Sequence, residues 1–195
     1  MGTIKTTNIE TITGSGTLTL GQSGETISVP SGATLDLSSA TQTGVGGVNT
    51  PAFQAYLSSD QTITELADVK IQFDTEFFDT DNCYDNSTNY RFTPTVAGKY
   101  LVYTSMRITA SADSDMRNTL AMFYKNGSRI NYFGTNYRNG NCRIAFCAGS
   151  MIVDMNGSSD YLEILAFADT VSGNNPFVDG GSADHAIFGA YKIIE

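Results

Sequence analysis

The chain has a single histidine, His185, so a hydrolase built on a serine or cysteine nucleophile has only this residue to use as its general base. His185 lies in the segment "GSADHAIFG", immediately before an alternating apolar run, and the sequence contains no Gly-x-Ser-x-Gly motif. Glycoside hydrolysis needs two opposed carboxylates, and no pair of acidic residues stands out in this acidic chain. We therefore expect His185 to be a turn or edge residue and the protein to have no enzymatic activity.

The segment "DTDNCYD", residues 79 to 85, gathers three carboxylates, Asp79, Asp81 and Asp85, which are candidate calcium ligands. It lacks the glycine and the glutamate that an EF-hand loop places at its sixth and twelfth positions, and a solvated acidic turn is the alternative. One histidine and three scattered cysteines do not have the spacing of a zinc site. We expect no cofactor, with calcium as the one candidate ion.

The segment "NYFGTNYRNGNCR", residues 131 to 143, reads as a loop that presents Tyr132, Tyr137, Arg138 and Arg143 among asparagines and glycines. Aromatic rings stack on sugar faces, and Asn and Arg side chains supply hydrogen bonds, so this is a candidate glycan-binding loop. The alternative is a hairpin whose rings pack on their own sheet or on a neighbouring protomer.

The acidic composition restricts the classes of partner. Eleven basic and 20 acidic residues give a net charge of −9, which argues against binding nucleic acid or an anionic membrane through a basic face. No apolar run is long enough to cross a bilayer, and the N-terminus lacks the apolar core of a signal peptide. We expect Cys83, Cys142 and Cys147 to be reduced thiols in a chain assembled in a cytoplasm, with a Cys142–Cys147 bridge as the alternative.

The elements that position these residues are strands. Apolar residues alternate with polar ones in residues 68–78, 98–110, 118–130, 142–155, 160–169 and 185–194, and no segment shows helical periodicity. Asn126-Gly127 predicts a hairpin turn, because this pair readily takes positive φ angles. Residues 48–195 therefore form an all-β domain of the sandwich, jelly-roll or barrel class.

Residues 1–47 have a different composition, rich in Gly, Ser and Thr and free of aromatic residues. Gly16, Gly24 and Gly32 recur every eight residues, and each precedes a short alternating run, which predicts short strands separated by turns. Each run offers too few apolar side chains to close a core in one chain. We interpret the segment as one that associates with other chains, and a flexible linker is the alternative. Its association residues are Leu18, Leu20, Ile27, Val29, Leu35 and Leu37.

Several motifs in residues 51–195 resemble those of C1q-like domains. They are "PAFQAYL" (51–57), Tyr84-Asp85, Phe92-Thr93-Pro94, Gly98 with Tyr100, and the closing "FGAYKII" (188–194). The resemblance implies a ten-stranded jelly roll of the C1q/TNF type that assembles as a homotrimer, with aromatic residues of each protomer at the threefold axis.

Residues 1–38 resemble the N-terminal part of fibre and structural proteins of marine bacteriophages. The two resemblances together imply a non-enzymatic protein of the virion surface, assembled in the host cytoplasm as trimeric projections. It would act as a small fibre or receptor-binding tip that contacts host glycan or protein, and residues 1–47 would bind other virion proteins. The alternatives are a capsid decoration protein anchored through that segment and a cellular lectin-like adhesin.

Overall fold

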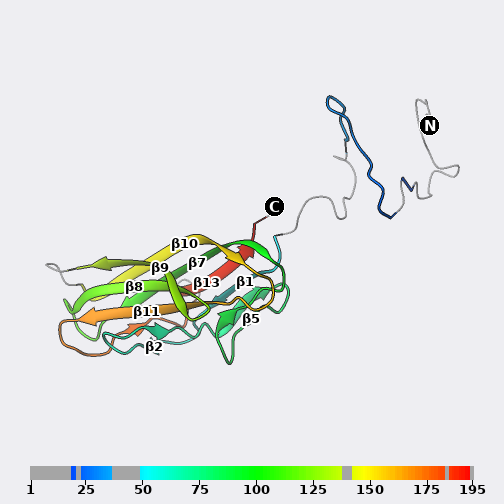
Figure 1. Ribbon diagram of the computed structural model, residues 1–195. Coiled ribbons are helices and arrows are strands. Elements are labelled where there is room, and N and C mark those ends of the chain that lie inside the picture. Colours follow the sequence, from blue (N-terminus) through cyan, green and yellow to red (C-terminus); the bar gives the residue numbers. More distant parts are fainter. Residues whose placement is uncertain (1–18, 21–22, 37–48, 138–141, 183–184, 194–195) are drawn as a thin grey trace, which may run out of the picture. The chain divides into compact units, whose positions relative to one another are not determined.

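The computed structural model describes residues 19–20, 23–36, 49–137, 142–182 and 185–193 (Figure 1). The chain divides into two units, Met1–Val45 and Gly46–Glu195, and the second is called the head domain below. Of the residues singled out in the sequence, Leu18, Leu37 and Arg138 lie outside the described ranges.

In the first unit, the described residues form turns but no strand. Gly24 and Gly32 adopt φ angles of 88° and 85°, and the amide of Ala33 donates a hydrogen bond to the carbonyl of Pro30 at 3.0 Å. The strands predicted within residues 23–36 are therefore absent from the single chain, because a strand needs a hydrogen-bonding partner along its edge. The apolar residues that would line them are all well exposed, namely Leu20, Ile27, Val29 and Leu35.

The head domain contains two antiparallel sheets, which form a sandwich (Figure 1). Sheet A consists of β1 (Ala52–Tyr56), β2 (Gln61–Thr62), β4 (Thr75–Asp79), β7 (Gly98–Thr109), β10 (Ile144–Met155), β12 (Phe177–Val178) and β13 (Ala186–Lys192). One edge of β7 pairs with β10 along its full length, and the other edge pairs with β13 and then with β12. β1 and β4 extend the sheet beyond β13, and the short β2 pairs with β12, which leaves β10, β4 and β2 at its borders.

Sheet B consists of β3 (Val69–Lys70), β5 (Tyr84–Asp85), β6 (Arg91–Phe92), β8 (Met116–Lys125), β9 (Ser128–Asn136) and β11 (Leu162–Thr170). β11 and β8 are its long central pair, and β9 continues the sheet from the far edge of β8. The predicted turn is confirmed, since Asn126 and Gly127 have φ angles of 53° and 76° and join β8 directly to β9.

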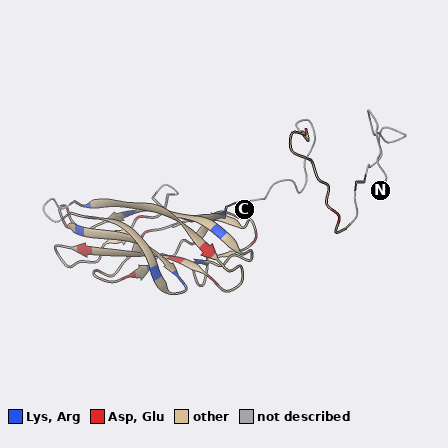
Figure 2. Ribbon diagram, turned by 45° about the horizontal axis from the view of Figure 1, so that its top comes forward, with Lys and Arg blue, Asp and Glu red and all other residues tan. Residues whose placement is uncertain are grey.

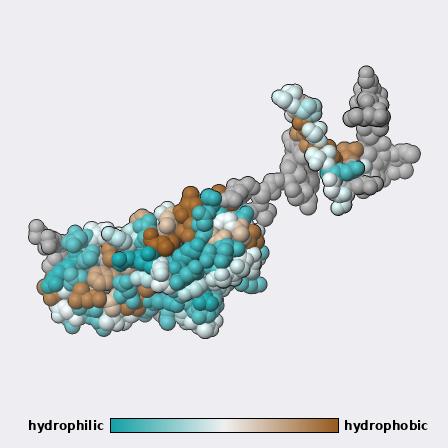
Figure 3. All heavy atoms as spheres, viewed as in Figure 1, coloured by the Kyte–Doolittle hydropathy of each residue, from teal (hydrophilic) through white to brown (hydrophobic). Residues whose placement is uncertain are grey.

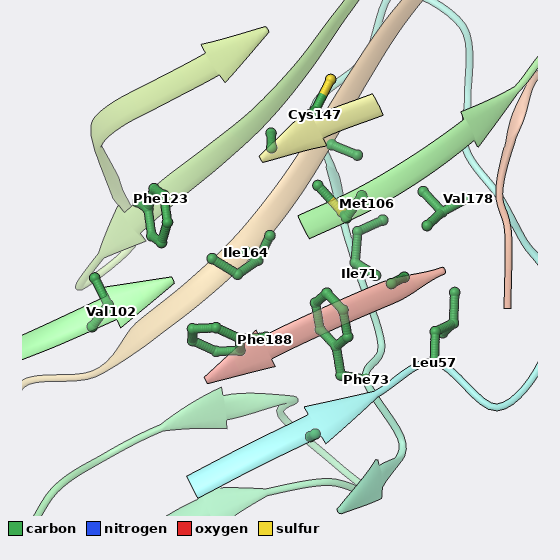
Figure 4. Close-up of a cluster of buried hydrophobic side chains, with 14 of the residues drawn as sticks. Leu57, Ile71, Phe73, Val102, Met106, Phe123, Cys147, Ile164, Val178 and Phe188 are labelled. Carbon is green, nitrogen blue, oxygen red and sulfur yellow. The ribbon is translucent and has the colours of Figure 1, made fainter. Parts of the chain in front are cut away.

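The core lies between the sheets, because each long strand turns alternate apolar side chains inward. Figure 4 shows side chains from both sheets meeting there, including Phe188, Ile71 and Ile164. At one end, the ring of Phe53 stacks on Tyr84 and Phe92, with centroid distances of 4.4 and 4.7 Å. The fully buried Phe53 thus ties β1 of sheet A to β5 and β6 of sheet B.

The two motif tyrosines of this core also satisfy their polar atoms. The Tyr84 hydroxyl donates a hydrogen bond to the carbonyl of Phe73 at 2.9 Å, and the Tyr100 hydroxyl donates one to the carbonyl of Val96 at 2.7 Å. Burial raises the pKa of Tyr84 and also that of Tyr100, the latter to about 12, so both side chains are neutral. Each hydroxyl holds a nearby backbone carbonyl by its hydrogen bond.

Three sequence predictions need correction. Residues 68–78 are not one strand but β3 and the start of β4, and residues 118–130 span the whole β8–β9 turn. Residues 131–136, predicted as a loop, belong to β9, because the turn at Asn126-Gly127 pairs the following chain with β8. Within the described ranges, no helix has the length and hydropathy needed to cross a membrane.

Candidate functional site

The side of sheet A that faces away from the core presents rows of apolar and aromatic side chains. Residues paired across antiparallel strands point to the same side, so the register defines the rows. One row runs through Ser150, Tyr103, Gly189, Gln54 and Phe78, the next through Ala148, Ser105, Ile187 and Tyr56, and a third through Ile152, Leu101 and Tyr191. We call this surface the outward face of sheet A.

Several large apolar side chains of this face are exposed. Phe146 is 65% exposed, Ile152 57% and Phe78 46%, and Figure 3 shows hydrophobic surface gathered along the side of the domain where β10 lies. Phe77 adds to it, since its ring lies 4.9 Å from that of Tyr56. The three rows contain no Asp or Glu, although the chain has a net charge of −9.

Charged residues lie mainly outside these rows. Figure 2 shows blue and red bands scattered singly over the head domain. On the border strand β10, Asp154 pairs with Lys99 of β7 at 3.4 Å, and this pair is well exposed. The outward face therefore carries exposed apolar side chains on its border strands β10 and β4, with the charged pair Asp154–Lys99 beyond the named rows, a mixture that protein–protein interfaces also show.

The aromatic Tyr103 lies at the centre of the face, over Gly189 of the neighbouring strand. A methyl group at position 189 would come within 2.4 Å of the ring carbon Cζ and the hydroxyl oxygen of Tyr103. Burial, and then the neighbouring Tyr191, raises the pKa of Tyr103, so the hydroxyl stays neutral at physiological pH. The ring provides a wide, uncharged contact surface.

His185 lies just before β13, and both of its ring nitrogens have protein partners. Nδ1 lies 3.1 Å from the carbonyl oxygen of Gly180, and Nε2 lies 3.2 Å from Nη1 of Arg107. A carbonyl can only accept, so Nδ1 carries the proton and Nε2 accepts from the guanidinium. Arg107 also lies 3.1 Å from Asp179, so His185 here links the start of β13 to β7, as expected for a turn histidine.

The three candidate calcium ligands are not gathered into one site. Asp79 accepts hydrogen bonds from the amides of Asp81 and Tyr84, and Asp81 accepts one from the Thr80 hydroxyl. Asp85 instead closes the following turn, where the amides of Ser87, Thr88 and Asn89 donate to it. Searched over the residues that the structure describes, the chain has no cluster of three or more acidic, His or Cys side chains suited to a metal ion.

The candidate glycan-binding residues are separated by the fold. Tyr132 projects from β9 and is 55% exposed, whereas Tyr137 packs against the core. Arg143 lies near Asp113, with 3.6 Å between Nη1 and Oδ1. Of these three residues, only Tyr132 lines a groove, and its neighbours there are Arg129, Asn118 and Asn136 rather than Tyr137 and Arg143.

All three cysteines are free thiols. Cys83 and Cys147 are buried, Cys142 is half-buried, and the Cys147 thiol lies 3.1 Å from the Thr119 hydroxyl. Burial raises the pKa of both Cys83 and Cys147, which disfavours the reactive thiolate. These thiols are core residues.

Sequence reasoning missed the outward face of sheet A, although a signal for it was present. In "IAFCAGSMIVDM", the strand β10, the buried positions Ala145, Cys147 and Val153 alternate with exposed ones that are also apolar, such as Phe146 and Ile152. A strand that is apolar in both phases is typical of one covered on both sides.

The head domain is similar in structure to several solved domains. It matches the globular domain of zebrafish complement 1qA with a TM-score of 0.51 and 14% identity, over 74% of this chain and 98% of that one. It matches an Eiger TNF from S. frugiperda with a TM-score of 0.53 and 10% identity, over 73% of this chain and 91% of that one. Murine APRIL matches with a TM-score of 0.50 and 8% identity, over 73% and 98%.

No protein-family model matches the sequence, and comparison with curated proteins gives no match. The fold is therefore established by structure, and it agrees with the resemblance that the sequence motifs indicated. The head domain of this chain is an all-β jelly roll of the C1q/TNF type.

Proposed function

We propose that the head domain forms a homotrimer through the outward face of sheet A. The observation that carries this proposal is the exposure of Phe146, Ile152 and Phe78 on the outward face, whose three named rows contain no carboxylate; Phe146 lies in the next row, opposite Arg107. Contiguous apolar surface of this kind is rare on a monomer and marks an association site. Three copies that meet around a threefold axis bury this apolar surface, and they do so without bringing like charges together.

A homotrimer fits this surface better than a flat dimer. Aromatic rings lie on strands from one border of sheet A to the other, from Phe146 on β10 through Tyr103 on β7 to Phe77 on β4. In a threefold arrangement, the β10 border of one copy packs against the centre of the next copy's sheet, which covers border and centre together. The resemblance to C1q-like domains supports the same arrangement, with aromatic residues near the axis.

We further propose that the trimer is a non-enzymatic structural protein of a bacteriophage virion. In this account the heads project from the particle surface as a small fibre or receptor-binding tip. The support is the resemblance of residues 1–38 to phage fibre proteins, together with the exposed apolar residues Leu20, Ile27, Val29 and Leu35. Contact with other chains would bury these side chains, as expected of a segment that binds other virion proteins.

Labelling of intact particles tests the location. Antibodies raised against the purified head are applied to particles and viewed by electron microscopy. Label confined to the tail or its tip is the expected result. Label spread evenly over the capsid would contradict the fibre and support the alternative, a capsid decoration protein anchored through the N-terminal segment. Particles without label would contradict both locations.

A further inference from the structure

A groove of about 420 Å³ lies between β8 and β9, on the side of sheet B that faces away from the core. This volume is in the range of small-ligand sites. The lining residues come from both strands: Asn118, Leu120, Arg129, Tyr132, Gly134, Thr135 and Asn136.

The groove exists because Gly134 has no side chain. The register of β9 against β8 places Tyr132, Gly134 and Asn136 opposite Met122, Leu120 and Asn118. A methyl group at position 134 would come within 2.0 Å of the carbonyl oxygen of Thr119, so the position is restricted to glycine. The backbone at Gly134 thus forms the bottom of the groove, and Tyr132 and Asn136 lie on either side of it.

The charge of the groove is opposite to that of the whole chain. The guanidinium of Arg129 lies over the Tyr132 ring, 5.5 Å from its centroid, and its Nη1 lies 3.8 Å from the sulfur of Met122. No described Asp or Glu forms an ion pair with Arg129, and none lines the groove. In a protein of net charge −9, this is a local site for an anion.

From this arrangement we infer that the groove binds a saccharide that carries a carboxylate. The exposed Tyr132 ring offers an apolar face on which a sugar ring stacks, and the side chains of Asn118 and Asn136 offer donors and acceptors for its hydroxyls. Arg129 pairs with the carboxylate, a charge-assisted contact that a neutral sugar cannot make.

The groove and the proposed trimer interface lie on different sheets. Sheet A supplies the interface, whereas the groove belongs to β8 and β9 of sheet B. The inference therefore goes beyond the virion proposal and does not depend on where the protein is located.

The test is a titration of the full-length protein, followed by nuclear magnetic resonance, with three acidic probes: tetragalacturonate, a glucuronate-containing tetrasaccharide and sialyllactose. The neutral counterparts are the methyl esters of the tetragalacturonate and of the glucuronate-containing tetrasaccharide, and lactose. We expect at least one acidic probe to saturate with a Kd of about 1 mM or tighter. Its neutral counterpart should bind at least about tenfold more weakly, because the charge-assisted contact is lost.

Matched variants localise the binding. Tyr132→Ala and Arg129→Gln should each weaken binding by about tenfold or more, because they remove the stacking face and the cation. The control is Arg91→Gln, since Arg91 lies over another tyrosine, Tyr161, at 4.5 Å outside the groove. Absence of saturation by all three acidic probes at about 10 mM would overturn the inference. Equal binding of a neutral counterpart, or an equal loss in Arg91→Gln, would overturn it as well.

Discussion

Tyr103 lies over Gly189, its partner on the neighbouring strand of sheet A, so closely that no side chain fits at position 189. The pair sits at the centre of the outward face, between β10 on one side and β1 on the other. A substitution at this point changes the surface and leaves the opposite side of the sheet, which faces the core, untouched.

The first prediction concerns this pair. Gly189→Ala should push the Tyr103 ring out of position and weaken assembly of the head by about tenfold or more, since interface packing is sensitive to one misplaced aromatic residue. Sedimentation equilibrium measures the association constant. In a Tyr103→Ala background the obstacle is gone, so adding Gly189→Ala there should change little. An equal loss in both backgrounds would show that the ring is not the cause.

The second prediction concerns the aromatic stack that joins the sheets. Phe53→Ala removes a fully buried ring that contacts Tyr84, Phe92 and Phe188, and should lower the free energy of unfolding by about 3–5 kcal/mol. Chemical denaturation at a fixed protein concentration measures this change. The control, Val171→Ala, alters a residue that is 48% exposed and should stay within about 0.5 kcal/mol of the wild type.

The third prediction concerns acid stability. The backbone amide of Thr88, the Asn89 side chain and the amides of Ser87 and Asn89 donate hydrogen bonds to Asp85 and lower its pKa from the usual 3.8. A carboxyl whose pKa is lower in the folded state adds stability above pH 3.8, and this stability is lost as the pH falls below that value.

Asp85→Asn should therefore lower the free energy of unfolding at pH 7 by about 1 kcal/mol, a modest value because the loop is open to solvent. The difference from the wild type should shrink as the pH drops below 3.8. Urea titrations at a series of pH values measure it. A difference that stays constant down to pH 2 would contradict the assigned role of the Asp85 charge.

The fourth prediction concerns the N-terminal segment. Changing Leu20, Ile27, Val29 and Leu35 to Ser should reduce incorporation into particles and leave the melting temperature of the head unchanged. Quantitative blotting of purified particles measures incorporation. The matched control changes four exposed polar residues of the same segment to Ala: Thr19, Thr26, Ser28 and Thr34. Full incorporation of the Ser variant would show that the segment is only a tether.

The all-β class of the head could be predicted because its long strands largely alternate, as in β7 and β11, and its jelly-roll type could be predicted from the resemblance of its motifs to C1q-like domains. The short strands could not. β2, β3, β5, β6 and β12 have two residues each. β3, β6 and β12 pair with long strands, whereas β5 pairs with β6 and β2 pairs with β12. Such pairing is set by tertiary contacts and leaves no periodic pattern in the sequence.

The sites were harder to predict than the fold, for a related reason. Tyr132 and Asn118 line the same groove because of the β8–β9 register, and their separation in sequence does not reveal it. The aspartates of residues 79–85 resemble metal ligands by spacing, but nearby amides donate hydrogen bonds to Asp79 and Asp85. Local turn chemistry thus accounts for these carboxylates before any ligand does.

The molar mass of the purified full-length protein in solution is the most direct test of the central claim. Light scattering at micromolar concentration should give three times the 20.9 kDa of one chain. Phe146→Lys should give one chain's mass with the head still folded, because it places three charges in an apolar interface, and Val171→Lys should remain trimeric. A wild-type mass of 20.9 kDa, or a trimer that Phe146→Lys leaves intact, would contradict assembly through the outward face of sheet A.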